Sequence, residues 1–107
     1  MGVISRVVGQ AKPSAATPVD LYTVPLNTQF QGNLVICNQT AILDYFRVAL
    51  RVGGAVLGVA QYLSYDEAIL QYTSQIITGI CLSPGDVVTI YSTNGGLSFN
   101  LTGLEIS

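Results

Sequence analysis

Short apolar segments alternate with turn-forming residues through most of this chain, at intervals of about ten residues from residue 21 onward. The segments are enriched in β-branched and aromatic residues, which favour strands. No sustained helical period is present, and only residues 64–72 could form a turn or two of helix. We therefore expect an all-β chain of about seven strands, at residues 21–25, 33–38, 45–52, 56–66, 74–82, 87–93 and 97–106.

Turn residues indicate how these strands connect. In residues 83–86 Pro is second and Gly third, the arrangement of a type II turn. The Asn-Gly-Gly at 94–96 predicts a tight hairpin between the last two strands. Gly103 interrupts the apolar alternation of the last strand and predicts a β-bulge. Because 107 residues suffice for one core, we expect a single antiparallel β-sandwich or jelly-roll-like domain over residues 21–107.

Residues 1–20 have a different composition from the rest of the chain. They contain two prolines and several small residues, and they show no clear period. This composition predicts an extended N-terminal arm with an apolar hook near its start. A hook of this kind would be buried against the body or against a neighbouring subunit, and its residues are Val3, Ile4, Val7 and Val8.

The scarcity of charge indicates a covered surface. Charged residues make up 9% of the chain, against about 25% in an average soluble domain. No run of about 18 apolar residues exists, so we expect no membrane span and no membrane partner. A subunit covered by protein needs few charges, which predicts a homo-oligomer, with a trimer as the favoured state. The four basic residues are dispersed and the net charge is −2, so nucleic acid is not an expected partner.

The residues that usually carry catalysis are sparse. The chain has no histidine, and we expect no metal and no cofactor. Asp66 and Glu67 form the only adjacent carboxylate pair, which we interpret as a solvated turn, and the sequence predicts no enzyme activity. Cys37 and Cys81 lie in apolar segments, which predicts reduced core thiols in a cytoplasm. The remaining strand-flanking carboxylates are expected to satisfy turn amides: Asp20, Asp44 and Asp86.

Arg47 and Arg51 share one face of the strand predicted at 45–52, where they would lie about 13 Å apart. They indicate either a solvated face or a subunit contact, since arginine is enriched at interfaces. The expected carboxylate partners, in the same or a neighbouring copy, are Asp44, Asp66 and Glu67.

Tyrosines are the second candidate surface. Six tyrosines occur without any tryptophan, and Tyr62, Tyr65 and Tyr72 are close in sequence. Such residues pack cores and subunit interfaces, and they can also stack against sugars. Tyr62 and Tyr65 are therefore interface candidates, with carbohydrate binding as an alternative.

Six phrases resemble those of a known group of proteins. They are "LYTVP", "LVICN", "FRVALRVGG", "QYLSYD", "LSPGDVVTIYST" and "LSFNLTGLEI", and together they span residues 21–106. The chain resembles small β-sandwich structural proteins of tailed bacteriophages. It departs from them in residues 1–20 and in "DEAILQYTS", where such proteins are more polar and richer in proline.

The resemblance implies a component of the virion, assembled in the host cytoplasm. The first interpretation is a capsid decoration or cement protein, a trimer that binds the major capsid protein or another virion protein. The second is a tail, baseplate or fibre component. The third, from another class of protein, is a carbohydrate-binding module.

Overall fold

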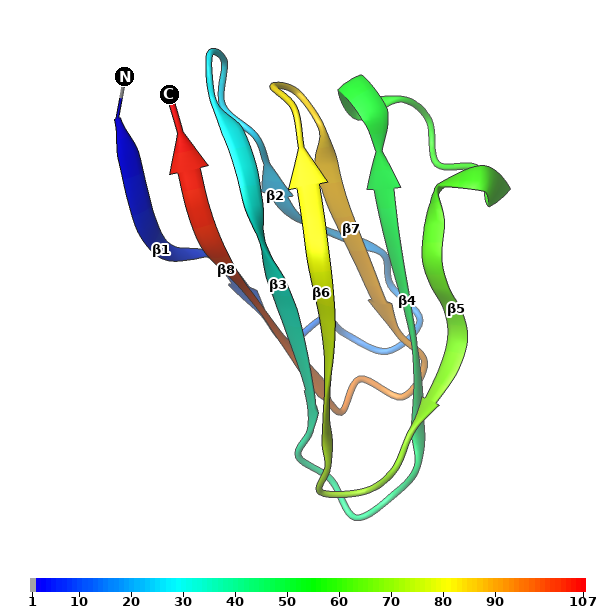
Figure 1. Ribbon diagram of the computed structural model, residues 1–107. Helices are drawn as coiled ribbons and strands as arrows, with labels where there is room; N and C mark the ends of the chain where they lie inside the picture. Colours follow the sequence, from blue (N-terminus) through cyan, green and yellow to red (C-terminus); the bar gives the residue numbers. More distant parts are fainter. Residues whose placement is uncertain (1) are drawn as a thin grey trace.

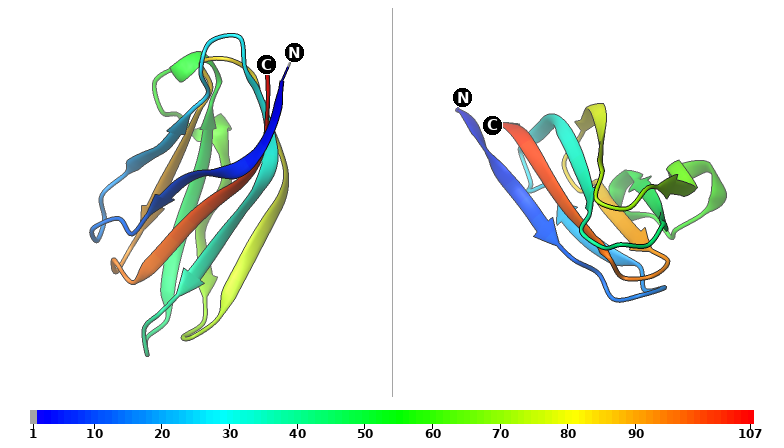
Figure 2. Two further views of the ribbon diagram at one scale, coloured as in Figure 1. Left: turned by 90° about the vertical axis from the view of Figure 1, so that its left-hand side faces the viewer. Right: turned by 90° about the horizontal axis from the view of Figure 1, so that it is seen from below.

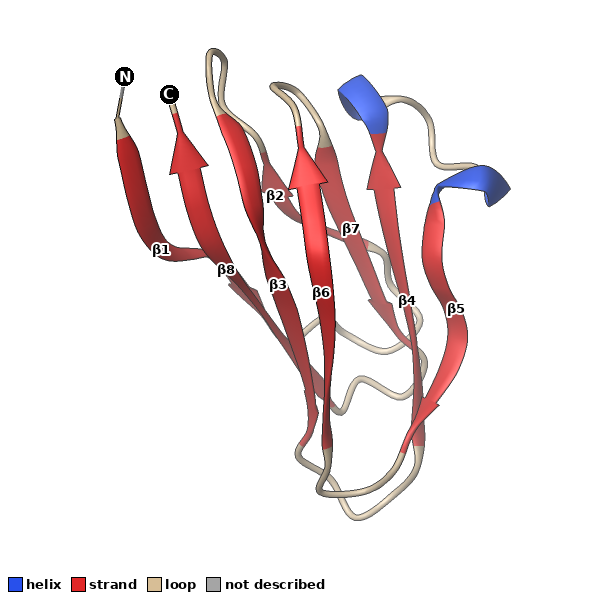
Figure 3. Ribbon diagram, viewed as in Figure 1, coloured by secondary structure: helices blue, strands red, loops and turns tan. Residues whose placement is uncertain are grey.

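The computed structural model describes residues 2–107, which form two four-stranded antiparallel sheets packed face to face (Figure 1). We call β1-β8-β3-β6 sheet 1 and β2-β7-β4-β5 sheet 2. Two single turns of 3-10 helix between β4 and β5 are the helical elements of this part of the chain (Figure 3). The elements are β1 (Val3–Ala11), β2 (Val19–Thr23), β3 (Gln29–Asn38), β4 (Asp44–Arg51), η1 (Val52–Gly54), η2 (Val59–Gln61), β5 (Tyr62–Ile69), β6 (Ser74–Leu82), β7 (Val87–Ser92) and β8 (Leu97–Ile106).

The chain winds back and forth between the two sheets. Six of its seven strand connections cross from one sheet to the other, and only β4 and β5 follow each other within one sheet. This strand order is that of an eight-stranded jelly roll. The all-β sandwich is therefore confirmed, with eight strands in place of about seven.

Alternate residues of the strands fill the space between the sheets. Phe30, Phe46 and Phe99 come from both sheets and are completely buried. Because successive side chains of a strand point to opposite faces, the same strands expose a second row on the outer faces. The fold thus fixes the core, and it leaves the two outer faces free to differ.

The expected N-terminal arm is wrong, because residues 3–11 form the edge strand of sheet 1. β1 pairs with β8 from Val3↔Ile106 to Ala11↔Phe99, and the two ends of the chain lie side by side (Figure 2). The apolar alternation is weak here because an edge strand is covered on one side only and its register shifts at Val8. Backbone hydrogen bonds to β8 hold this strand in place, and such bonds cannot be predicted from the order of side chains in the sequence.

The expected hairpin at residues 94–96 is also wrong. The turn leads from β7 in sheet 2 to β8 in sheet 1, so the strands that it joins are not paired. Asp44, a fully buried residue, accepts hydrogen bonds from the backbone nitrogens of Asn94 at 2.9 Å and Gly96 at 3.1 Å. A carboxylate thus satisfies amides that a hairpin would satisfy through its own backbone. The type II arrangement of residues 83–86 is confirmed, with Gly85 at φ 85°.

The predicted bulge at Gly103 is absent. β8 pairs with β3 without interruption, and Gly103 lies opposite Gly32. A Cβ on Gly103 would lie 2.1 Å from the carbonyl oxygen of Gln31, and one on Gly32 would lie 2.1 Å from that of Thr102. Glycine inside a strand commonly marks either a bulge or a close approach of two backbones, and here it is required for the close approach of β3 and β8. As a result Glu105 points inward, and Leu104 lies on the outer face.

Residues 56–66 do not form one strand. Residues 52–61 form the connection that contains η1 and η2, and β5 begins at Tyr62. Residues 64–69 belong to this strand and form no helix, and Asp66 and Glu67 lie within it. The expected solvated turn at this carboxylate pair is therefore wrong, although both side chains are exposed.

We predict that Gly103→Ala lowers the free energy of unfolding by about 2–3 kcal/mol, because the added methyl group meets backbone atoms that cannot move independently. Chemical denaturation measures the loss. Gly58→Ala is the matched control: Gly58 has φ −144°, and its Cβ would lie 4.0 Å from the carbonyl oxygen of Val56. Equal stability of the two variants would contradict the close approach of β3 and β8.

Candidate interaction site

Arg47 lies on the outer face of β4, between a carboxylate and two aromatic rings. Its Nε donates to Asp66 Oδ1 at 2.6 Å, and its Nη2 donates to Asp66 Oδ2 at 3.2 Å. Its guanidinium carbon is 4.2 Å from the ring centroid of Tyr65 and 4.3 Å from that of Tyr91. The hydrogen bond to Asp66 raises the pKa of Arg47. The cation is thus held by two charge-assisted hydrogen bonds and two cation–π contacts.

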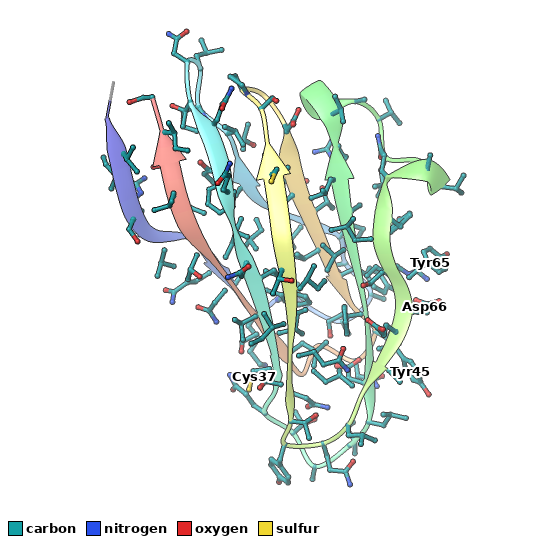
Figure 4. The ribbon with its side chains drawn as sticks, in the orientation of Figure 1. Cys37, Tyr45, Tyr65 and Asp66 are labelled. Atoms are coloured by element: carbon teal, nitrogen blue, oxygen red, sulfur yellow. The ribbon has the colours of Figure 1, made fainter. Side chains whose placement is uncertain are left out.

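A bulge in β5 builds this arrangement. Phe46 pairs with Glu67 and Val48 with Ser64, so Tyr65 and Asp66 together lie opposite the one residue between Phe46 and Val48. Asp66 has φ 53°, a conformation that aspartate tolerates better than most residues. The bulge directs both side chains outward, where Figure 4 shows them beside β5.

Among the expected tyrosines, Tyr62 and Tyr65 come together. Their rings meet edge to face, with centroids 4.9 Å apart. Tyr72 lies in the connection between β5 and β6, at a positive φ of 54°. Tyr91, which the sequence does not single out, completes the cluster from β7, because β4 lies between β5 and β7 in the sheet.

Arg51 binds a different set of partners. It donates to Asp20 Oδ2 at 2.9 Å, to Thr89 Oγ1 at 3.0 Å, and to the carbonyl oxygens of Gly54 at 3.2 Å and Ala55 at 3.1 Å. The side chain therefore joins β2 and β7 to the start of the loop that follows β4. Two backbone carbonyl oxygens of this loop, those of Gly54 and Ala55, therefore accept hydrogen bonds from Arg51.

The expected partners of the two arginines are partly confirmed. Asp66 contacts Arg47, whereas Asp44 is buried at the far end of the sandwich, and Asp20 is the partner of Arg51. Sequence reasoning missed Asp20 because it assigned residues 1–20 to an arm. A contact of either arginine with a second copy stays a prediction.

Turn-capping carboxylates are confirmed at two of the three expected positions. Asp86 accepts from the backbone nitrogens of Gly53 at 2.8 Å and Ser83 at 2.9 Å, and Asp44 serves the turn after β7. Asp20 instead lies on the outer face of β2, where it accepts from Arg51 and Thr89. Asp44 and Asp86 thus fix loops, whereas Asp20 joins strands of sheet 2.

The apolar hook residues do not act as a unit. Val3, Ile4 and Val7 are exposed along β1, at 58%, 55% and 50%, whereas Val8 packs against the core. Val8 differs from the other three because it lies at the register shift between Val7 and Gly9, where it packs against the core. Three of the four residues thus remain available at the surface.

The cysteines are not core residues, contrary to expectation. Cys37 is half-buried and Cys81 is exposed, and both point away from the core of sheet 1. Cys81 pairs with Gln31, six residues from Cys37 on β3, so the two thiols are about 20 Å apart and cannot form a disulfide within one chain. Their flanking apolar residues belong to the inner face, and the two-residue alternation places the thiols outside.

A second ionisable cluster ties the two sheets together at the β1 edge. Tyr22 of β2 donates a hydrogen bond to the Glu105 carboxylate, and Arg6 of β1 pairs with Glu105 at 3.0 Å. Burial, followed by the hydrogen bond and charge of Glu105, raises the pKa of Tyr22 well above its ordinary value near 10. The folded chain therefore favours the neutral phenol.

Within residues 2–107, no group of three or more His, Cys, Asp or Glu side chains is placed to hold a metal ion. The helical turns of that part of the chain are also too short to cross a membrane. Two shallow pockets lie near the end that carries the chain termini, and Cys81 is the only titratable side chain among their lining residues: Asn27, Gln29, Phe30, Gln31, Cys81, Leu82, Ser83, Pro84, Ile106 and Ser107.

Comparison with known proteins gives no relative: no protein-family model, no curated protein and no solved structure matches this chain.

We predict that Asp66→Asn lowers the free energy of unfolding by about 0.5–1 kcal/mol, because Arg47 loses its charged partner while asparagine still accepts the positive φ. The loss should shrink in about 1 M salt, which screens exposed pairs. Denaturant titrations at low and high salt measure it. Glu67→Gln, at the adjacent position without an arginine partner, is the control and should change little.

We also predict that the stability of the wild type falls more steeply than that of Tyr22→Phe as the pH rises above about 10. The unfolded phenol ionises near pH 10, whereas the folded phenol ionises only at higher pH. The contribution of Tyr22 is thus complete below pH 10 and is lost above it. Parallel stability curves for the two proteins would show that folding does not raise the pKa of Tyr22.

Proposed function

We propose that this chain is a non-catalytic structural subunit of a tailed-phage virion, a decoration or cement protein that binds the shell as a small homo-oligomer. The observation that supports an adhesive role is the connection between β4 and β5. We call residues 52–60 the apolar loop, because each of them is apolar or glycine. Val56 and Val59 are the most exposed large apolar residues of the described chain, at 90% and 93%, and Val52 in the same loop is 74% exposed.

The apolar loop is held in a defined shape. Arg51 binds two of its carbonyl oxygens, and Asp86 binds its Gly53 nitrogen at 2.8 Å. At its other end, Gln61 Oε1 accepts from the Gly58 nitrogen at 2.8 Å. An ordered apolar loop loses little conformational freedom on docking, so more of its burial energy is available for binding. Isolated valines at a surface are ordinary, but three on one anchored loop form a docking element.

The fold and the sequence resemblance support the virion part of the proposal. Eight-stranded jelly rolls are a common architecture of virus coat proteins, although the same architecture also serves lectins and enzymes. The six phrases that resemble those of phage structural proteins fall on β2, β3, β4, β5, β7 and β8, and β6 lies almost wholly outside them. Within residues 2–107, all charged side chains except Lys12 and Glu67 serve ion pairs or turns, which favours adhesion over catalysis.

The tail and carbohydrate alternatives are less well supported. A tail, baseplate or fibre component would use the same apolar loop, and electron microscopy of particles distinguishes it from a shell protein by position. For sugar binding, Arg47 already lies over the rings of Tyr65 and Tyr91, so it occupies aromatic faces on which a sugar would stack. A glycan array with the purified chain tests that alternative.

We predict that Val56→Asp/Val59→Asp abolishes attachment of the purified chain to phage particles that lack it, because two charges cannot be buried in an apolar contact. The fold should be unaffected, because both side chains are almost fully exposed. Co-sedimentation with particles measures attachment. Ser14→Asp/Gln71→Glu adds the same charge at exposed positions outside the loop and should attach normally. Normal attachment of the loop variant would contradict the proposal.

A further inference from the structure

We propose that two copies of this chain pack back to back through the outer face of sheet 1. This contact would be the interface of the homo-oligomer in the proposed function, and its biological role rests on that function. It forms in solution without phage particles. An isologous contact of this kind closes at two copies, so it gives a dimer in place of the trimer that the sequence favours.

The outer face of sheet 1 carries no charged side chain at any strand position of the described chain. We define this neutral face by the residues whose side chains point outward from β1, β8, β3 and β6 according to the strand register. They are Val3, Ser5, Val7, Gln10, Gln29, Gln31, Asn33, Val35, Cys37, Ser74, Ile76, Cys81, Ser98, Asn100, Thr102, Leu104 and Ile106.

The charges of the chain lie elsewhere. Arg47, Arg51, Asp20 and Asp66 lie on the outer face of sheet 2, joined in two ion pairs. Glu105 points inward from sheet 1 and binds Arg6 at the sheet edge. The remaining charged residues lie in connections, at turns or on the β5 edge: Lys12, Asp44, Glu67 and Asp86. The two outer faces of one sandwich are therefore chemically unlike.

A second copy of the same face suits this chemistry. Amides occupy the middle of the face, and each amide both donates and accepts hydrogen bonds, so the neutral face complements itself. Gln10 already donates to Asn100 at 2.7 Å within one copy. Val7, Leu104 and Ile76 add apolar area, at 50%, 37% and 61% exposure. A charged partner would gain no ion pair here and would lose hydration.

The face is also large enough. Four strands about 4.8 Å apart and up to 10 residues long, at about 3.3 Å per residue, cover roughly 600 Å² of flat area. Because side chains project from the sheet, its accessible surface is larger than its flat area and approaches the roughly 800 Å² per partner of a standard interface. Back-to-back packing would leave both charged faces of sheet 2 exposed to water, which is the arrangement that keeps a dimer soluble.

The test is the dissociation constant of the purified chain by analytical ultracentrifugation. Gln31→Glu/Asn100→Asp places two negative charges on β3 and β8, the central strands of sheet 1, with almost no change of shape. The carboxylate introduced on β8 still accepts a hydrogen bond from Gln10, so the fold should be retained, which thermal unfolding verifies. We expect the wild type to be dimeric and the variant to dissociate at least tenfold more readily. Ser14→Asp/Gln71→Glu, with the same added charge outside the face, should remain dimeric.

Three outcomes would overturn the inference. They are a wild type that stays monomeric at high concentration, a wild type that forms trimers, and a dimer that the two face charges do not weaken. The last outcome would point to pairing along the open edge of β1. None of these results depends on particle attachment, and loss of attachment in the apolar-loop variant with an intact dimer would leave this inference standing.

Discussion

The structure depends on the burial of one row of side chains from each sheet in a single layer between the sheets. Phe30, Phe46 and Phe99 anchor that layer. Because a strand shows its other row to the outside, burial fixes the inner faces of both sheets and places no such demand on the outer ones. The outer faces and the connections are therefore free to differ chemically from one another.

Those surfaces carry few charged side chains, and most of the charges form ion pairs within the same chain. Three of the four basic residues pair with carboxylates of the same chain: Arg6 with Glu105, Arg47 with Asp66 and Arg51 with Asp20. Each pair joins different strands, so these charges organise the sandwich. The apolar loop and the neutral face are left without charge, and both suit contacts with protein. This division is consistent with the proposed adhesive role.

Local sequence patterns predicted the strands well and their partners poorly. The apolar alternation of β4, β6, β7 and β8 placed these strands close to their observed bounds, because each strand buries one face, whereas β3 begins at Gln29, four residues before the expected start at 33. Turn chemistry at residues 94–96 predicted a hairpin, but the buried carboxylate of Asp44 stabilises a connection between sheets instead. A single Gly103 could signal a bulge or a close approach, and only the opposing Gly32 distinguishes the two.

The sequence by itself determined the all-β class, the scarcity of charge and the common face of Arg47 and Arg51, because composition and a two-residue period are local properties. Tertiary structure alone decided that residues 3–11 join a sheet, that Asp20 reaches Arg51, and that neutral side chains from four strands share one surface. Those facts depend on strand pairing between residues far apart in the chain, and backbone hydrogen bonds that set such pairing leave almost no trace in side-chain order.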